Sequence, residues 1–201
     1  LDDVDEEIRR DVAKLIADTT LDSVGETTGR VNDLMLWLMA CARNISHEGK
    51  NVAWTSPMGM PVVQSYRRRK TITLQTSFQA CQFHVESLDH LPCNVGKQRN
   101  AIVPNFIHSV DAAHAGRTAI ACRRQGVAFV GIHDAFLSHA ETMPQLHRTT
   151  REEFVGIHEL ALADRVWAEW RQMYPGVDLP EPPPRGDYDV RDVLDARYAF
   201  S

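Results

Sequence analysis

Apolar side chains recur at intervals of three and four along two segments in the first part of the chain. Between Glu6 and about Ala17 the pattern predicts an amphipathic helix, and we expect Gly25 and Gly29 to end that region. A stronger stripe follows and predicts a second helix, which Gly49 closes in a left-handed conformation. The apolar positions of this second helix are Val31, Leu34, Leu38, Cys41 and Ile45. We expect core packing to explain them.

The pattern then changes to one that is typical of short strands. Val52–Thr55 and Met60–Tyr66 flank the turn-forming residues Ser56–Gly59, which predicts a β-hairpin. Thr71–Val85 is rich in Thr, Ile, Leu and Phe and has no helical period. We expect one more strand there, followed by an irregular loop to Asn100.

Helical patterns return in the second half of the chain and enclose another predicted hairpin. Pro104 and Asn105 predict the start of a long helix that runs to Gln125, because Gly126 supplies a left-handed stop. Two short apolar runs within about 127–139 then flank the sequence His-Asp-Ala. They predict a hairpin that carries the His-Asp pair at its tip.

The C-terminal quarter predicts a helix, a rigid segment and a tail. Pro144 opens a helix through Leu162, and Val166–Met173 continues it with two tryptophans that we expect to be exposed. The proline-rich residues Pro180–Gly186 predict a rigid stretch. Asp187–Ser201 places aromatic residues among polar ones, which indicates a tail that docks through its aromatic side chains.

Composition places the chain among ordinary folded proteins without a bulk positive charge. Its 201 residues, 43% of them hydrophobic, can build one good core or two small ones. The formal net charge of -5 means that any contact with nucleic acid must be local. Separate basic points occur at Arg67–Lys70, at Lys97 with Arg99, and at Arg123–Arg124. No run approaches the roughly 20 apolar residues of a membrane span, so no membrane role is expected.

Cysteine usage and the first residues bear on the compartment. Four cysteines in unlike contexts argue against a secreted disulfide framework and favour a reducing interior. The chain opens on Leu1 without an initiator methionine or a recognisable leader, so we expect the natural start of the protein to lie upstream.

The pair His133-Asp134 is the first candidate for chemistry. It lies between apolar runs, where an ionised carboxylate is costly unless it is paired or binds a cation. One reading makes Asp134 a simple turn former at the surface. The other makes it a metal ligand for phosphoryl transfer, which needs a second carboxylate that no pattern in these residues supplies.

His108 and Asp111 form the second candidate. They lie three residues apart on the predicted long helix, so they share a face with the small residues Ala112 and Ala115. Small neighbours permit close approach by a partner. A histidine on a helix is also often a structural residue, and the pattern alone leaves both readings open.

Four blocks of the sequence resemble single-subunit, phage-type RNA polymerases, most of all the mitochondrial ones. Lys97–His114 resembles the segment that precedes the palm hairpin in that family, and Gly131–Phe136 resembles its third catalytic motif. Trp54–Val62 resembles its Trp-Thr-x-Pro-x-Gly-x-Pro-Val hairpin, and Tyr198–Ser201 resembles its aromatic C-terminus. The blocks occur in the family's order, which makes coincidence improbable.

The resemblance implies an α+β fold, mostly helical with short antiparallel β-hairpins, from the C-terminal palm and fingers part of a right-hand polymerase. Residues 1–50 would be helices that link fingers to palm. Residues 51–201 would be the palm, with the His-Asp hairpin at about 127–139, a C-terminal helix and a docked aromatic tail.

The resemblance also implies DNA-directed RNA polymerase activity, in which ribonucleoside triphosphates are joined by a two-metal mechanism. Asp134 maps onto a carboxylate that binds two Mg²⁺ ions together with an upstream aspartate, and His133 maps onto its neighbour in the same catalytic motif. The implied partners are the DNA template, the RNA transcript, the nucleotides and transcription accessory factors. The implied compartment is the mitochondrial matrix.

The nucleic-acid-binding residues implied by the resemblance lie on or before the long helix. His108 maps onto a residue that faces the minor groove of the new base pair, where acceptors on every base report pairing geometry. Asp111, Lys97 and Arg99 belong to the same block and are expected to contact nucleic acid.

The departures from the family pattern limit what the chain does alone. The first palm motif and the fingers motif of the family are expected upstream of Leu1, so we expect these residues by themselves to be inactive. Two alternatives are a family A DNA polymerase palm and a non-catalytic, nucleic-acid-binding remnant of a polymerase. Ala135 and the pair His108-Ser109 favour an RNA polymerase over a DNA polymerase.

One further pattern lies outside the resemblance. Cys81 and His84, then His90 and Cys93, form a mirrored pair with spacings that a tetrahedral zinc site could use. The alternative is an ordinary surface loop.

Overall fold

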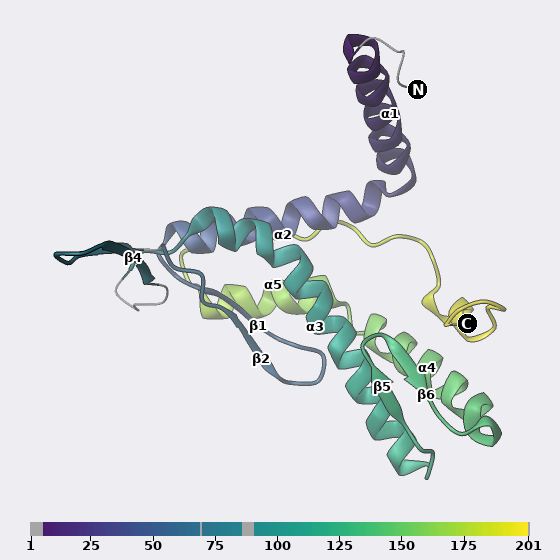
Figure 1. The fold of residues 1–201 in the computed structure, drawn as a ribbon. Helices are drawn as coiled ribbons and strands as arrows, with labels where there is room; N and C mark the ends of the chain where they lie inside the picture. The colour runs from purple at the N-terminus through teal and green to yellow at the C-terminus, as the bar shows by residue number, and fades with distance from the viewer. Residues whose placement is uncertain (1–5, 69, 86–90, 201) are drawn as a thin grey trace.

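The computed structural model describes residues 6–68, 70–85 and 91–200. In these ranges the α-helices are α1 (Glu6–Thr27), α2 (Gly29–His47), α3 (Val95–Arg124), α4 (Met143–His158) and α5 (Leu162–Met173). The antiparallel strand pairs are β1 (Val52–Thr55) with β2 (Pro61–Gln64), β3 (Lys70–Gln75) with β4 (Ala80–Val85), and β5 (Val130–Ile132) with β6 (Ala135–Leu137). Short 3-10 turns are η1 (Ala140–Thr142) and η2 (Val190–Leu194). The prediction of a mostly helical chain with short antiparallel strand pairs is confirmed (Figure 1).

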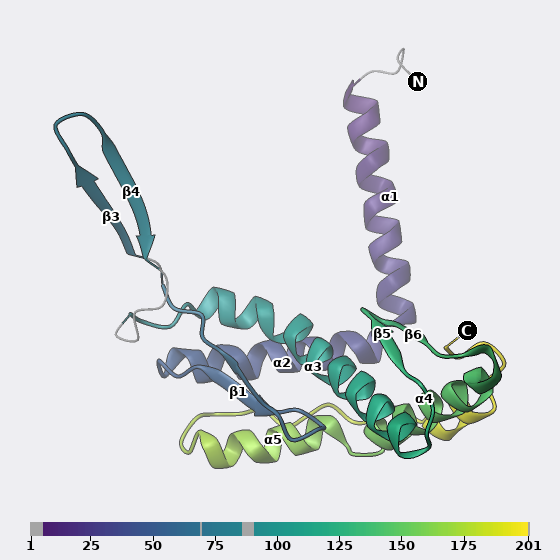
Figure 2. The same ribbon diagram turned by 60° about the horizontal axis from the view of Figure 1, so that its bottom comes forward.

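The main core lies where α2, α3 and α5 surround β1, as Figure 2 shows. Strand β1 supplies Trp54, which packs against Phe106 of α3 at a ring-centroid distance of 6.0 Å. The indole N–H of Trp170, from α5, donates to the Ala53 carbonyl at 2.7 Å, and the Tyr174 hydroxyl donates to the Asn51 carbonyl at 2.8 Å. The polar atoms of these two side chains therefore have partners, which removes most of the cost of their burial.

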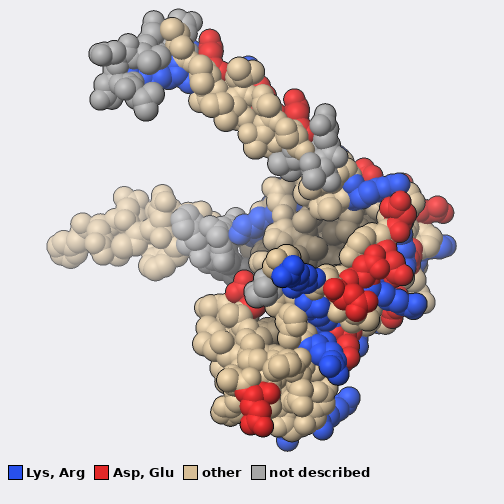
Figure 3. Space-filling model, turned by 90° about the vertical axis from the view of Figure 1, so that its right-hand side faces the viewer, with Lys and Arg blue, Asp and Glu red and all other residues tan. Residues whose placement is uncertain are grey.

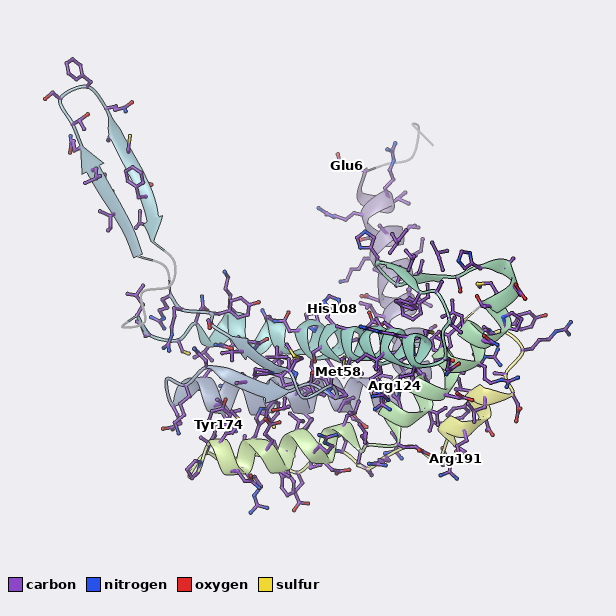
Figure 4. All side chains as sticks on the ribbon, turned by 90° about the horizontal axis from the view of Figure 1, so that it is seen from below. Glu6, Met58, His108, Arg124, Tyr174 and Arg191 are labelled. Atoms are coloured by element: carbon purple, nitrogen blue, oxygen red, sulfur yellow. The ribbon has the colours of Figure 1, made fainter. Side chains whose placement is uncertain are left out.

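The turn between β1 and β2 is held against α3 by a close contact. Met58 lies in this turn, and its thioether occupies the space where a Cβ atom on Gly116 would stand (Figure 4). Glycine at that position lets the turn lie directly on the helix backbone. The contact positions the β1–β2 pair along the middle of α3.

The first helix is longer than the sequence pattern predicts. α1 continues through Gly25 to Thr27, and Gly29 starts α2 instead of ending the preceding region. A glycine inside a helix costs only about 1 kcal/mol relative to alanine, which the flanking turns can tolerate. The apolar positions Ile8, Val12, Leu15 and Ile16 remain exposed on α1, which stands away from the rest of the molecule (Figure 1).

The expected strand and irregular loop before Asn100 are instead a hairpin and the start of α3. Strands β3 and β4 pair from Lys70↔Val85 to Gln75↔Ala80 and project from the body. α3 begins at Val95, where the side chain of Asn94 accepts a hydrogen bond from the Lys97 amide at 3.1 Å. Pro104 therefore lies inside the helix, and its predicted role as the first residue is wrong.

The expected single C-terminal helix is two helices. α4 ends at His158, and Ala161 adopts a left-handed φ of 54° before α5 begins. That conformation is unfavourable for a residue with a Cβ and breaks the helical path. The reversal carries α5 back to the main core, where Trp170 is 0% exposed, so the prediction that both tryptophans are exposed is wrong for this one.

Charged side chains of both signs are interspersed over the face shown in Figure 3. The projecting arm of β3 and β4 carries no Lys, Arg, Asp or Glu from Thr71 to Val85. No helix in the described ranges is long and apolar enough to span a membrane.

Truncation of Trp170 should show how much of the stability depends on the main core. Trp170→Ala removes a fully buried ring and leaves the Ala53 carbonyl unpaired, so we expect a loss of about 3–5 kcal/mol in the free energy of unfolding. Trp167→Ala is the matched control on the same helix, because its ring is only partly buried. Urea unfolding of both variants measures the difference, and equal losses would contradict this account of the core.

Candidate active site

The His-Asp pair occupies the predicted hairpin tip. Ile132 pairs with Ala135, so His133 and Asp134 form the two-residue connection between β5 and β6. His133 has a positive φ of 55°, as tight hairpin turns require at one or both central positions. Both side chains are exposed, and the strand pair that carries them is confirmed.

The hairpin stands on a small second core. Cys122 at the end of α3, Val127 and Leu146 of α4 are buried together, with Phe129 and Phe136 packed against them. The rings of Phe129 and Phe136 are 5.1 Å apart between centroids. Since each strand has only three residues, this cluster and not the backbone ladder fixes the position of Asp134.

Asp134 opens into a pocket of about 460 Å³ between the hairpin, α3, α4 and the C-terminal segment. The pocket also contains Asp111, so the structure brings two of the predicted site residues together. The remaining lining residues are His114, Ala135, Phe136, Met143, Leu146, His147, Thr150 and Phe200. Two carboxylates with a partly apolar wall can attract a cation or the polar end of a ligand.

His114 forms the floor of this pocket and was not predicted as a site residue. It is 6% exposed, and because a carbonyl only accepts, its Nε2–H donates to the Thr150 oxygen at 2.8 Å. Its ring lies 6.0 Å from that of Phe136 and 5.4 Å from that of Phe200. The sequence signal was its position three residues after Asp111, which places both on one side of α3.

The other predicted residues spread along α3 instead of gathering in the pocket. His108 is exposed, and Figure 4 shows it on the side of α3 away from α5. At 100° per residue Lys97, His108 and Asp111 share one side of the helix, while Arg99 points to the other. Lys97 and His108 are separated by about 16 Å along the axis, a span that suits an extended ligand. Because α3 begins at Val95 and not at the expected Pro104, His108 lies near the middle of the helix and not at its start.

The C-terminal tail is docked, but not by both expected anchors. Phe200 packs on His114 and on Phe154, with centroid distances of 5.4 and 5.2 Å. Tyr198 is 74% exposed, so its predicted role as an anchor in this tail is wrong. Backbone carbonyls of the tail accept hydrogen bonds from α4, and the side chain of Arg191 forms an ion pair with Glu159 at 2.8 Å.

The predicted zinc pattern is described only in part. His90 and the side chain of His84 lie outside the described residues. The Cys93 thiol is buried and donates to the Lys50 carbonyl at 3.2 Å. Among the residues that the structure describes, no three His, Cys, Asp or Glu side chains gather as a metal site. Zinc binding stays a prediction.

Two buried cysteines are held in the neutral thiol form. Burial raises the pKa of the Cys41 thiol to about 12, with a smaller opposing effect of a backbone hydrogen bond. Burial also raises the pKa of the Cys122 thiol beneath the hairpin. Because the thiolate is the reactive form, neither can serve as a nucleophile near neutral pH. Their role is packing.

Comparison with known proteins shows the family to which the chain belongs. A model of the family described as DNA-dependent RNA polymerase matches residues 1–178, and the chain belongs to this family. It is 40% identical over 185 residues to DNA-directed RNA polymerase 2A of Nicotiana tabacum, covering 92% of this chain and 55% of that protein.

Other relatives carry organelle names. DNA-directed RNA polymerase 1, mitochondrial, of Nicotiana sylvestris is 37% identical over 92% of this chain and 18% of its own length. DNA-directed RNA polymerase 3, chloroplastic, of the same plant is 38% identical over 92% of this chain and 19% of its own length. The chain thus spans about half of one curated relative and less than a fifth of these two.

Thiol labelling should separate the cysteines by their surroundings. In the native chain we expect iodoacetamide at pH 8 to modify Cys81, which is partly exposed on β4, well before the buried Cys41 and Cys122. Mass spectrometry of peptides after timed quenching gives the order, and urea-unfolded protein is the control in which all sites react. Early labelling of Cys122 in the native chain would show that the second core is open.

Proposed function

We propose that the chain is the C-terminal palm part of a DNA-directed RNA polymerase and takes part in template-dependent nucleotidyl transfer. In this proposal residues 1–50 link fingers to palm, and residues 51–201 form the palm and its tail. The substrates are ribonucleoside triphosphates, and the partners are the DNA template, the RNA transcript and accessory factors. The observation that carries the proposal is an exposed carboxylate, Asp134, presented by a hairpin turn into a pocket shared with Asp111.

The residues of the pocket could supply part of the ligands of a Mg²⁺ site. In the described part of the chain, the Asp134 carboxylate has no hydrogen-bond or ion-pair partner, so its oxygens are open to a cation. Mg²⁺ is commonly held by one or two carboxylates together with substrate phosphates and water. When bound, two such ions would neutralise charge on the attacking and leaving oxygens. We propose that Asp134 supplies one carboxylate and that an aspartate outside these 201 residues supplies another.

We assign different tasks to the residues around Asp134. His133 holds the turn conformation that directs the neighbouring carboxylate, since it occupies the positive-φ position. Asp111 lies between the pocket and the exposed side of α3, which makes it the residue closest to both the metal and the nucleic acid in this proposal. The exposed Lys97 would meet phosphates further along the duplex. The exposed Arg99, on the other side of α3, would contact a different part of the nucleic acid.

His108 is proposed to test the geometry of the newly formed base pair. It is exposed next to Ala112, with no hydrogen-bond partner among the described residues, so no structural task occupies its ring. A neutral imidazole can donate to minor-groove acceptors, which occupy similar places in all correct pairs and move in a mispair. This use requires no cation and no sequence preference.

The compartment is proposed to be the mitochondrial matrix. Relatives of similar identity are named as mitochondrial and as chloroplastic polymerases. These names support an organelle in general more widely than they support the mitochondrion in particular. Imaging of the tagged full-length gene product with matrix and plastid markers tests it.

Replacement of Asp134 by asparagine tests the metal assignment. In the full-length gene product we expect Asp134→Asn to lower the elongation rate on the order of a thousandfold or more, because charge compensation for Mg²⁺ is lost. Template binding should be nearly unchanged, since phosphate contacts elsewhere remain. Glu181→Gln is the matched control, an exposed carboxylate far along the chain. Primer extension gives the rate, and robust elongation by Asp134→Asn would refute the assignment.

Replacement of His108 by alanine tests the proposed geometric check. One hydrogen bond contributes on the order of 1 kcal/mol, so we expect His108→Ala to reduce selectivity against mismatched nucleotides several-fold while Mg²⁺ dependence stays unchanged. His47→Ala, an exposed histidine at the end of α2, is the control. Single-nucleotide incorporation of correct and incorrect substrates is the measurement, and equal selectivity in all three proteins would show that His108 has no such role.

A further inference from the structure

Arg151 is a buried cation whose role neither the sequence pattern nor the proposed chemistry explains. It lies on α4 and is 8% exposed, and no carboxylate forms an ion pair with it in the part of the chain that the structure describes. A guanidinium taken out of water is costly unless its N–H groups find acceptors. Its acceptors here are neutral and come from the C-terminal segment.

The guanidinium fork joins two points of that segment. Nη1 donates to the Leu194 carbonyl at 2.9 Å, and Nη2 donates to the Ala199 carbonyl at 3.1 Å. These carbonyls lie on either side of residues 195–198, so one side chain fixes both ends of this short stretch. A lysine ammonium is a point charge without this planar fork and cannot reproduce the geometry.

His147 supports the same contact from one turn earlier on α4. Its Nε2 lies 3.1 Å from the Ala199 oxygen and 3.3 Å from Nη2 of Arg151. In one tautomer it donates to the carbonyl, and in the other it accepts from the guanidinium. Nε of Arg151 donates to the same carbonyl at 3.3 Å, so two guanidinium nitrogens hold the Ala199 oxygen.

Fixing Ala199 determines where the next residue goes. Phe200 adopts a positive φ of 56°, which is unfavourable for a side chain of this size and needs support from its surroundings. Its ring contacts His114 and Phe154 and lines the pocket of Asp111 and Asp134. His114 in turn contacts Phe136, two residues after Asp134. An unbroken series of contacts runs from Arg151 to the hairpin.

We propose that Arg151 is a positioning residue that clamps the C-terminal segment through the Leu194 and Ala199 carbonyls, so that Phe200 forms a wall of the Asp111–Asp134 pocket. The catalytic consequence rests on the proposed polymerase function, whereas the clamp itself does not. Arg151 acts through the tail and touches neither substrate nor metal.

Amide hydrogen exchange tests the clamp on the chain itself. The amides of Asp195 and Ala196 are hydrogen-bonded within the η2 turn, so their exchange reports release of the tail. We expect Arg151→Lys to speed this exchange at least tenfold, while peptides around Trp170 in the main core keep their protection. Arg148→Lys, an exposed arginine on the same helix, is the control and should leave the tail protected.

Nucleotide addition by the full-length gene product tests the consequence. We expect Arg151→Lys to lower kcat about tenfold with little change in KM for the nucleotide. The variant loses the pocket wall formed by Phe200, whereas the contacts to the nucleotide remain. Phe200→Ala, which removes the wall and leaves the clamped carbonyls, should lower kcat similarly while the tail amides stay largely protected. The double variant should be no slower than either single one.

The outcomes separate the two claims. Unchanged tail exchange in Arg151→Lys refutes the clamp, whatever the kinetics show. A released tail with normal kcat, or additive losses in the double variant, refutes the role of the clamp in the pocket. If Arg151→Lys loses protection in the main core as well, Phe200→Ala decides, since normal kcat in that variant also refutes the wall. An inactive unmodified gene product would refute the proposed function and leave the exchange result on the clamp standing.

Discussion

The continuity of α3 is the constraint on which the rest of the structure depends. Its first half buries Ile102 and Phe106 in the main core with α2 and β1, and its second half brings His114 and Cys122 beneath the hairpin and α4. The helix must therefore run unbroken past Pro104, although a proline in a helix interior costs about 3 kcal/mol. The Asn94 cap at one end and Gly126 at the other keep both halves in one rigid element. Through this helix the exposed side that carries His108 and the pocket of Asp111 and Asp134 hold a fixed relation.

The placement of Asp134 shows how a small cluster can position a charged group. The β5–β6 pair is too short to be stable by itself, and the outward side chains of Val130 and Ile132 bury little. The hairpin is held by Phe129 and Phe136, which pack on the residues at the end of α3 and the start of α4. A turn presented in this way leaves the Asp134 carboxylate exposed to solvent. The structure thereby avoids the cost of burying an unpaired charge that the apolar flanks of the sequence suggested.

Local signals predicted the elements well where one strong rule acted alone. Gly49 and Gly126 ended their helices as expected, and the His-Asp turn lay where two apolar runs met. Errors in helix boundaries arose where two signals competed. Pro104 and Asn94 both match the start of a helix, and only tertiary packing decides between them. Ala161 gave no local sign of its left-handed conformation, because the reversal there is imposed by the burial of Trp170. The pocket depends on contacts between α3, α4 and the tail. The spacing of His114 from Asp111 therefore shows only that both lie on one side of α3, and no spacing points to Arg151.

The hydrogen-bond acceptors of Arg151 are neutral carbonyls, which add no negative charge near the pocket. A carboxylate would satisfy the guanidinium more strongly than a carbonyl, but it would add a negative charge beside His147, which also lines the pocket of Asp111 and Asp134. Like charges at short range raise the cost of keeping each carboxylate ionised, and a third one could draw a cation away from the hairpin. Carbonyls of Leu194 and Ala199 give the fork its directional acceptors without that competition. A tail fixed through its backbone also leaves its side chains free, so that Phe200 can pack on His114 while Tyr198 remains in solvent.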